Sequence, residues 1–423
     1  MKRDQFDFIA NSNTLWNYAS VAICGTAGLL LTIIIGAYYG PAALGAFNII
    51  YAFYIILSQV AAFGVHHSVL KHVAEFADDQ NLRRIVFSSG LAATVPLALL
   101  VSFCLWGLRW PIAELMKSTA VAQGLVWAAL GLFFFALNKV LLAALNALTR
   151  LKEYAAYMSL RFVFMIGALL LLIALGQPAG NLALLLPAAE IVLFILLFMA
   201  LLKELQNANQ TIIYGWIWRH LSFGFRGFGG NLLLDLNTRV DVLCLGFFVS
   251  DRIVGIYSMA AILAEAIYQL PLVLRTVFNP RVIQMLAAKA YDPLQALMRK
   301  TRLWVWTGMS ITALASVILY PHVIPLISGH QEYAEGTVVF GVIMVGIVVA
   351  SGYVPFGMLL ANAGLPGRQT GMIVMLLLIN VVGNLLLIPY LGSLGAALTT
   401  AVAHISSFCL LRYFSKRYLS LII

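Results

Sequence analysis

Twelve long apolar stretches follow one another along the chain, and they limit its fold more than any other feature. An α-helix needs about 20 mainly apolar residues to cross the hydrocarbon core of a bilayer. Only 10% of the 423 residues are charged and 62% are hydrophobic, which excludes an ordinary globular domain. We therefore expect an all-α polytopic membrane protein with twelve transmembrane helices. The predicted spans are 14–38, 45–66, 85–108, 121–146, 155–176, 182–202, 221–248, 253–276, 303–326, 337–361, 370–391 and 393–414.

Positive charge falls mainly on one side of these predicted helices. Alternate connections, together with both termini, hold 18 of the 26 Lys and Arg residues, whereas the opposite connections hold only Arg109, Lys117 and Arg252. Because cytoplasmic loops carry an excess of Lys and Arg, this pattern predicts that both termini are cytoplasmic. The net charge of +10 is then a sign of topology and of attraction to anionic lipid headgroups, and it does not indicate a nucleic-acid partner.

The two halves of the chain, 1–205 and 206–423, echo each other. The matched positions are Gly45 with Gly255, Asn146 with Asn362 and Gly180 with Gly395, at offsets of 210, 216 and 215 residues. Since six helices return a chain to the side where it began, the repeat predicts two six-helix bundles in parallel orientation, related by a pseudo-two-fold axis. Such repeats are typical of transporters in which two bundles rock about a site between them.

The seventh predicted span contains ionisable side chains within an apolar run. Asp235 and Arg239 are four residues apart and can pair on one helix face, and Asn231 lies on that face too. A charge near the bilayer centre costs roughly 2.5–3.5 kcal/mol on insertion scales, so such residues usually face protein or a watery cavity. One interpretation is a neutralised structural ion pair. The repeat favours the other interpretation, in which this helix lines a hydrophilic transport cavity.

Further charged residues lie within or at the edges of other predicted spans. Lys139 is near the cytoplasmic end of the fourth helix, where it either extends to the interface or faces the cavity. Glu190, in the sixth helix, faces the bundle or a neighbouring helix. Arg161 belongs to the fifth predicted helix, and Glu265 and Arg275 belong to the eighth. Because lipid-facing charges are rare, such residues usually face a protein interior or a watery cavity.

No feature predicts a metal, a cofactor or an enzyme. The histidines after the second helix, His66, His67 and His72, have no clear set of carboxylate partners, so we interpret them as part of an interfacial amphipathic segment. The four cysteines lie in apolar runs without metal-ligand spacing. The glycines around Arg226 resemble a phosphate-binding loop only superficially, since no strand precedes them.

Three segments resemble a known transporter family. They are Tyr39–Asn48 (YGPAALGAFN), Arg239–Ala260 and Asn380–Thr400. With these motifs in this order, nearly the whole chain resembles the Wzx-type polysaccharide or O-antigen flippases of the multidrug/oligosaccharidyl-lipid/polysaccharide exporter superfamily. Drug-exporting members typically use an acidic residue in the first helix. This helix has none after Asp7, a departure that weakens the drug-exporter interpretation.

The resemblance implies a flippase that moves undecaprenyl-diphosphate-linked oligosaccharide repeat units from the cytoplasmic to the periplasmic leaflet of the bacterial inner membrane. A diphosphate with several sugars cannot cross hydrocarbon unaided, so a cavity must supply cations and amides. Arg239 is the first candidate for the diphosphate, because a guanidinium can grip phosphate oxygens bidentately. Each asparagine candidate can instead hold helices together. The further substrate-binding candidates are Arg226, Lys139, Arg275, Asn231, Asn237, Asn17 and Asn48.

Three carboxylates are candidates for ion coupling: Asp235, Asp241 and Glu265. Carboxylates in a poorly solvated cavity can exchange protons, and the coupling cation is either H⁺ or Na⁺. Asp241 either takes this cation or locks the seventh helix to a neighbour. The alternative function is a cation-coupled multidrug or small-molecule exporter of the same fold. A glycan polymerase or ligase needs a large outer loop, which the sequence lacks, although polymerase machinery remains an expected partner alongside membrane lipids.

Overall fold

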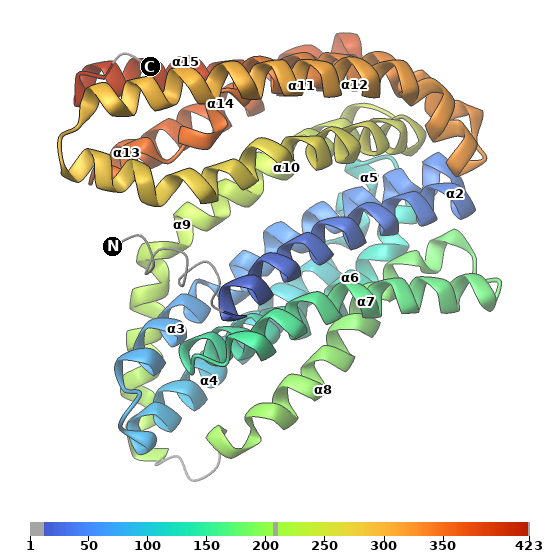
Figure 1. The fold of residues 1–423 in the computed structure, drawn as a ribbon. Helices are drawn as coiled ribbons and strands as arrows, with labels where there is room; N and C mark the ends of the chain where they lie inside the picture. The colour runs from blue at the N-terminus through green and yellow to red at the C-terminus, as the bar shows by residue number, and fades with distance from the viewer. Residues whose placement is uncertain (1–11, 206–209, 422–423) are drawn as a thin grey trace. The chain divides into compact units, whose positions relative to one another are not determined.

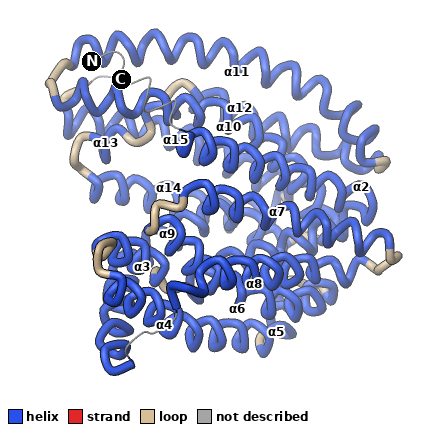
Figure 2. The backbone as a smooth tube through the Cα atoms, turned by 60° about the horizontal axis from the view of Figure 1, so that its bottom comes forward, coloured by secondary structure: helices blue, strands red, loops and turns tan. Residues whose placement is uncertain are grey.

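Helices make up nearly all of the structure, a computed structural model that describes residues 12–205 and 210–421 (Figure 1). The described residues contain α-helices and short 3₁₀ segments but no strand (Figure 2). The all-α fold expected from the sequence is therefore confirmed. Ten helices among these residues are long and apolar enough to cross a membrane. Helices suit a bilayer because each satisfies its own backbone hydrogen bonds where no water is present.

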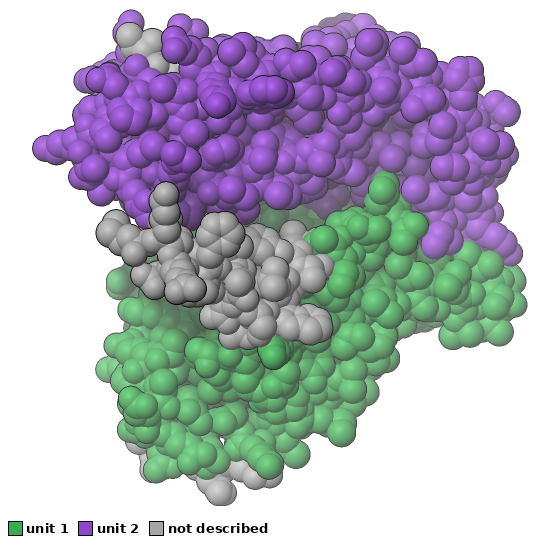
Figure 3. Space-filling view, in the orientation of Figure 1, with its two compact units in different colours: residues 1–31, 49–235 green, residues 32–48, 236–423 purple. Residues whose placement is uncertain are grey.

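The chain packs into two compact units, coloured green and purple in Figure 3. Unit 1 contains the chain up to Leu31 together with Ile49–Asp235, and unit 2 contains Thr32–Asn48 and the chain from Leu236 onward. These units follow packing, whereas the predicted halves 1–205 and 206–423 follow a sequence repeat. The boundary between the halves therefore stays a prediction.

Unit 1 is arranged around α6, which contacts α3, α4, α7 and α8. Aliphatic side chains such as Val140, Leu141 and Leu193 are fully buried there. Side chains at Asp79 and Ser118 accept backbone hydrogen bonds and begin α4 and α6. The helices with residues in unit 1 are α2 (Ser12–Ala62), α3 (Val65–Glu75), α4 (Gln80–Gly107), α5 (Arg109–Leu115), α6 (Thr119–Ala147), α7 (Leu151–Ala174), η1 (Ala179–Leu184), α8 (Leu185–Leu205) and the first part of α9 (Gln210–Phe248).

Unit 2 is arranged around α12, which contacts α10, α11 and α15. A second core there buries Leu294, Leu359 and Leu360. After the last part of α9, its helices are α10 (Asp251–Ala287), α11 (Tyr291–Ser328), η2 (Gln331–Gly336), α12 (Thr337–Ser351), η3 (Val354–Phe356), α13 (Leu359–Asn362), α14 (Pro366–Leu391) and α15 (Ser393–Leu419).

Gly40 divides α2 into two helical segments, which correspond to the first two predicted spans. Gly40 in α2 has a φ of 82° and a ψ of 177°, outside the helical region, and Pro41 follows it. A side chain at Gly40 would be strained at this φ, and proline is favoured at the first position of a new helical segment. At 1.5 Å per residue the segments on the two sides of Gly40 are about 42 Å and about 33 Å long, and each can cross a hydrocarbon core about 30 Å thick.

The tenth predicted span is shorter than the sequence suggested. We expected a helix over 337–361, but α12 ends at Ser351 and is followed by η3 and α13. The break contains Gly352 and Pro355, and proline removes a backbone donor. Hydropathy did not reveal the break, because the neighbouring Tyr353 and Phe356 are apolar and buried.

Candidate functional site

The polar residues of α9 belong to both compact units. Asn231 and Asp235 belong to unit 1, and Asn237, Arg239 and Asp241 belong to unit 2. The helix runs without interruption from Gln210 to Phe248. Each unit therefore contains part of this polar stretch of α9.

In unit 1, Asp235 is tied to α2. The Nε2 of Gln59 donates to Oδ2 of Asp235 at 2.6 Å. The neighbouring Ser58 accepts a hydrogen bond from Nζ of Lys139 at 2.8 Å. Adjacent residues of α2 thus hold an anion of α9 and a cation of α6. The structure brings the sequence-predicted residues Lys139 and Asp235 into one cluster.

Asn231 lies one turn before Asp235 and contacts α3. Its Nδ2 is 2.7 Å from Nε2 of His67, whose ring lies 4.0 Å from that of His66 between centroids. The helix α3 buries Val65, Ser68, Val69 and Val73 against unit 1. Among the described residues, no group of three or more His, Cys, Asp or Glu side chains is placed to hold a metal ion.

A buried ion pair lies deeper in unit 1. Nε of Arg161 is 2.8 Å from Oε1 of Glu190, and the two side chains are 14% and 2% exposed. Nδ2 of Asn138 donates to Oε2 of Glu190 at 2.7 Å. The Arg161 guanidinium lies 4.2 Å from the centre of the Phe135 ring, and Nζ of Lys139 lies 4.8 Å from it. The Phe135 ring is therefore within cation–π distance of both cations.

The cluster of unit 2 is centred on Asp241. The hydroxyl of Tyr257 donates to Oδ2 of Asp241 at 2.5 Å and lies 3.3 Å from Oγ1 of Thr400. The backbone N–H of Val242 donates to Oδ1 at 2.8 Å. Tyr257 is fully buried, so its hydroxyl needs a partner in place of water. Through this contact the carboxylate connects α9 with α10 and α15.

Two asparagines of α14 extend this cluster. Nδ2 of Asn380 donates to the backbone oxygen of Asn237 at 3.2 Å, and Nδ2 of Asn384 donates to Oδ1 of Asn380 at 2.9 Å. Asn384 is completely buried. Asn380 therefore joins α14 to α9, whereas the hydrogen bond of Asn384 stays within α14.

The remaining predicted residues lie in varied surroundings. Arg226 and Glu265 are exposed and Arg275 is partly buried. Nδ2 of Asn48 is buried, and it has no hydrogen-bond partner among the described residues. Asn17 lies in α2, in a stretch whose side chains are outside the described part of the chain. These five residues are not shown in contact with Asp235 or Asp241.

Sequence reasoning overlooked several members of the two clusters. Ser58, Gln59 and Tyr257 are uncharged, and no spacing pattern distinguishes them from ordinary helix residues. Arg161 and Glu190 carried a usable signal, because a buried charge usually finds an opposite one. The sequence showed both charges but not that the fifth and sixth predicted helices bring them together.

Apolar helices that bury paired charges and amides between them are typical of a multi-pass membrane protein. A family model described as "Polysaccharide biosynthesis protein" matches residues 11–286. The chain belongs to this family, and the resemblance identified from the sequence is confirmed. The sequence matches no curated protein at a significant level.

Solved structures share the fold at low sequence identity. A lipid II flippase MurJ in an inward closed conformation is 16% identical, with a TM-score of 0.77, and the alignment covers 95% of this chain and 87% of MurJ. An inward-facing multidrug resistance MATE family transporter of the MOP superfamily is 13% identical, with a TM-score of 0.74 and coverages of 93% and 94%. A Vibrio cholerae MATE transporter is 14% identical, with a TM-score of 0.60 and coverage of 98% of each chain.

Proposed function

We propose that the protein is a flippase that moves undecaprenyl-diphosphate-linked oligosaccharide repeat units to the periplasmic leaflet of the bacterial inner membrane. Family membership and the likeness to a lipid II flippase support this class of substrate. The chain acts as a transporter, and no bond of the substrate is made or broken. It works beside the machinery that polymerises the glycan.

The observation that carries this proposal is the position of Lys139. Its ammonium group lies between the apolar helices α2 and α6. It is fixed there by the Ser58 hydroxyl of α2 and the face of the Phe135 ring of α6. A cation held in this way can attract a diphosphate, while nearby amides and aromatic rings suit sugars. Arg239 provides a second cation on α9. Arg226, Arg275, Asn231, Asn237, Asn17 and Asn48 complete the proposed set of substrate-binding residues.

Twelve membrane crossings follow if α2 crosses twice, with its kink at Gly40, and α9 supplies one more crossing. The ten apolar helices count α2 once and do not include α9. The lower hydropathy of α9 fits a helix that presents polar residues to a transport path. The proposed topology has both termini in the cytoplasm and two parallel six-helix halves.

We propose ion coupling through Asp235, Asp241 and Glu265, with H⁺ or Na⁺ as the coupling cation. Asp241→Asn should abolish ion-dependent flipping, because the neutral amide cannot exchange a cation. Tyr257→Phe removes the hydrogen bond to Asp241 and keeps the carboxylate, so flipping should become slower but stay ion-dependent. Equal loss of ion dependence in both variants would instead assign Asp241 a purely structural role.

Flipping can be tested in proteoliposomes containing a fluorescent undecaprenyl-diphosphate-linked oligosaccharide, with outer-leaflet sugar detected by a glycosidase. Lys139→Met should lower the initial rate at least tenfold, because the diphosphate loses a cation. The matched control is Lys152→Met, which removes an exposed lysine at the start of α7. Equal rates for Lys139→Met and the unaltered protein would overturn this role for Lys139. No flipping by the unaltered protein would overturn the function itself.

The second candidate is a cation-coupled exporter of drugs or other small molecules. The specific observation in its favour is the likeness to MATE transporters along nearly the whole chain. Expression in a drug-sensitive bacterial strain distinguishes the two candidates. The flippase proposal predicts unchanged drug susceptibility and restored surface polysaccharide in a flippase-deficient strain with a matching glycan. Drug resistance without restored polysaccharide would support the exporter.

A further inference from the structure

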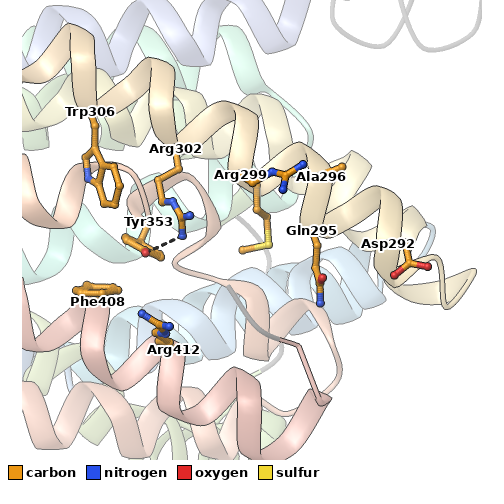
Figure 4. A pocket seen from close by; sticks show the side chains of 10 residues that line it. Asp292, Gln295, Ala296, Arg299, Arg302, Trp306, Tyr353, Phe408 and Arg412 are labelled. Atoms are coloured by element: carbon orange, nitrogen blue, oxygen red, sulfur yellow. Dashed lines mark hydrogen bonds between the residues drawn. The ribbon is translucent and has the colours of Figure 1, made fainter.

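A cavity of about 690 Å³ lies in unit 2, and its lining includes none of the residues assigned above to transport. Its walls come from the first half of α11, the segment after α12 and the second half of α15 (Figure 4). The volume is within the usual range for ligand sites, about 300–1,000 Å³. Six lining residues carry the argument: Arg299, Arg302, Trp306, Tyr353, Phe408 and Arg412.

Arg302 is held rigidly in this cavity. Its guanidinium lies 5.2 Å from the ring centre of Trp306 and 5.3 Å from that of Tyr353, and Nη1 donates to the Tyr353 hydroxyl at 2.8 Å. Gly352 leaves space for its stem, because a Cβ there would come 2.6 Å from Cγ of Arg302. Nε of Arg302 is buried and has no hydrogen-bond partner among the described residues. The Arg302 side chain is thus fixed in position before any ligand binds, and its Nε–H is a hydrogen-bond donor that no described residue uses.

Two further arginines give the cavity a positive charge. Arg299 precedes Arg302 by one helical turn on α11, and Arg412 follows Phe408 by one turn on α15. The ion pairs found among the described residues include none of these three arginines. Asp292 is the only acidic residue in the lining, and it lies near the start of α11 (Figure 4). Such a lining favours an anion.

The aromatic residues add an apolar wall beside these charges. The rings of Tyr353 and Phe408 are stacked with centroids 4.2 Å apart, and Trp306 meets Tyr353 edge-on at 5.7 Å. Nε1 of Trp306 donates to the backbone oxygen of Val349 at 3.1 Å, which fixes the indole. Three guanidinium groups beside a rigid aromatic wall suit a phosphate attached to an organic group better than a bare ion.

The surroundings indicate a lipid. Leu303 and Trp304, next to Arg302 in the sequence, are 58% and 73% exposed, and Ile311 farther along α11 is 65% exposed. The predicted topology places this basic start of α11 at the cytoplasmic surface. A lipid with its phosphate among the arginines could therefore lay its acyl chains along the exposed apolar face of α11. Tryptophan is also typical of the membrane interface.

We propose that this cavity binds the phosphodiester headgroup of an anionic glycerophospholipid from the cytoplasmic leaflet. The guanidinium groups of Arg299, Arg302 and Arg412 hold the phosphate, and the glycerol lies against Trp306 and Phe408. Basic pockets between transmembrane helices on the cytoplasmic side are suited to such headgroups. This lipid is a bound partner of the protein and is not the molecule that the protein transports.

Binding can be measured on the full-length protein in detergent by native mass spectrometry, with phosphatidylglycerol and phosphatidylcholine as probes. Arg299→Gln/Arg412→Gln removes the two exposed arginines and leaves Arg302 packed, so the fold should persist. Lys300→Gln/Lys416→Gln is the matched control, since it removes two exposed cations from the same helices outside the cavity. A thermal unfolding curve for each variant verifies the fold.

The expected result is at least a tenfold loss of bound phosphatidylglycerol in the arginine variant, little loss in the lysine variant and weak binding of phosphatidylcholine throughout. Equal losses in both variants would overturn the proposal, because surface charge alone would then explain binding. Displacement of phosphatidylglycerol by millimolar inorganic phosphate would also overturn it in favour of a soluble-anion site. Selective loss of undecaprenyl diphosphate binding instead would reassign the cavity to the carrier lipid. These measurements do not depend on flipping, so their failure leaves the proposed function intact.

Discussion

At the scale of single residues, the pair formed by Arg161 and Glu190 illustrates what charge costs in this protein. Both side chains are largely removed from solvent, and Asn138 donates a further hydrogen bond to the carboxylate. Breaking a buried pair by removing one partner leaves an uncompensated charge, whereas replacing both partners with apolar residues is often tolerated. Each residue of the pair therefore needs the other to be present, but the pair as a whole adds little net stability.

Replacing Glu190 alone should be strongly destabilising. Glu190→Leu leaves the Arg161 guanidinium buried without its carboxylate, and we expect the free energy of unfolding to fall by about 3–5 kcal/mol. Arg161→Leu/Glu190→Leu should recover most of that loss. Chemical denaturation of the three proteins in detergent micelles measures the difference. If the single variant is as stable as the unaltered protein, the ion pair has no structural importance.

At the scale of elements, the contact between α2 and α10 depends on two glycines. A Cβ on Gly45 would lie 1.8 Å from the backbone oxygen of Asp251, and a Cβ on Gly255 would lie 1.8 Å from that of Pro41. Neither position leaves room for a side chain. Gly45 and Gly255 are also matched in the sequence repeat, so the proposed pseudo-two-fold relation gains support from a contact in which each glycine faces the other's helix.

Gly45→Leu should therefore prevent Thr32–Asn48 from packing within unit 2. Ala37→Cys with His330→Cys reports on this packing, because the backbone oxygen of Ala37 lies 3.2 Å from Nε2 of His330. In a background without native cysteines, a short thiol cross-linker should join the two positions. The yield should fall at least fivefold with Gly45→Leu.

The matched control for this experiment is Gly25→Leu in the same helix. A Cβ at Gly25 would meet no atom within 4 Å, so the cross-linking yield should be unchanged. A high yield with both variants would show that Gly45 is not needed for the packing of α2 on α10.

Elements were easier to predict from the sequence than contacts between them. Long apolar runs indicate helices because a bilayer leaves the backbone few alternatives. The rotation of each helix about its axis depends on packing against neighbours, which a single sequence does not display. Asp241 was therefore recognised as unusual, while its partner Tyr257 on the next helix was not. The end of α12 was missed for a similar reason, since buried aromatic residues continue past the break.

At the scale of the whole molecule, the proposed topology is the property on which transport direction depends. Two parallel halves require that corresponding loops of both units reach the same side of the membrane. Lys152 and Ala288, one in each unit, are exposed residues on the proposed cytoplasmic side. Ala179 and Gln331, again one in each unit, are exposed on the proposed periplasmic side. These four positions sample both sides of both units.

Labelling of single cysteines at these positions tests the topology. In a background without the four native cysteines, a membrane-impermeant maleimide applied to cells with a permeabilised outer membrane should label Ala179→Cys and Gln331→Cys. Lys152→Cys and Ala288→Cys should be labelled only after the inner membrane is opened, because the positive charges of their loops hold them in the cytoplasm. Labelling of one unit with the opposite pattern would exclude parallel halves. Reversal of the pattern in both units would invert the protein and overturn the proposed direction of flipping.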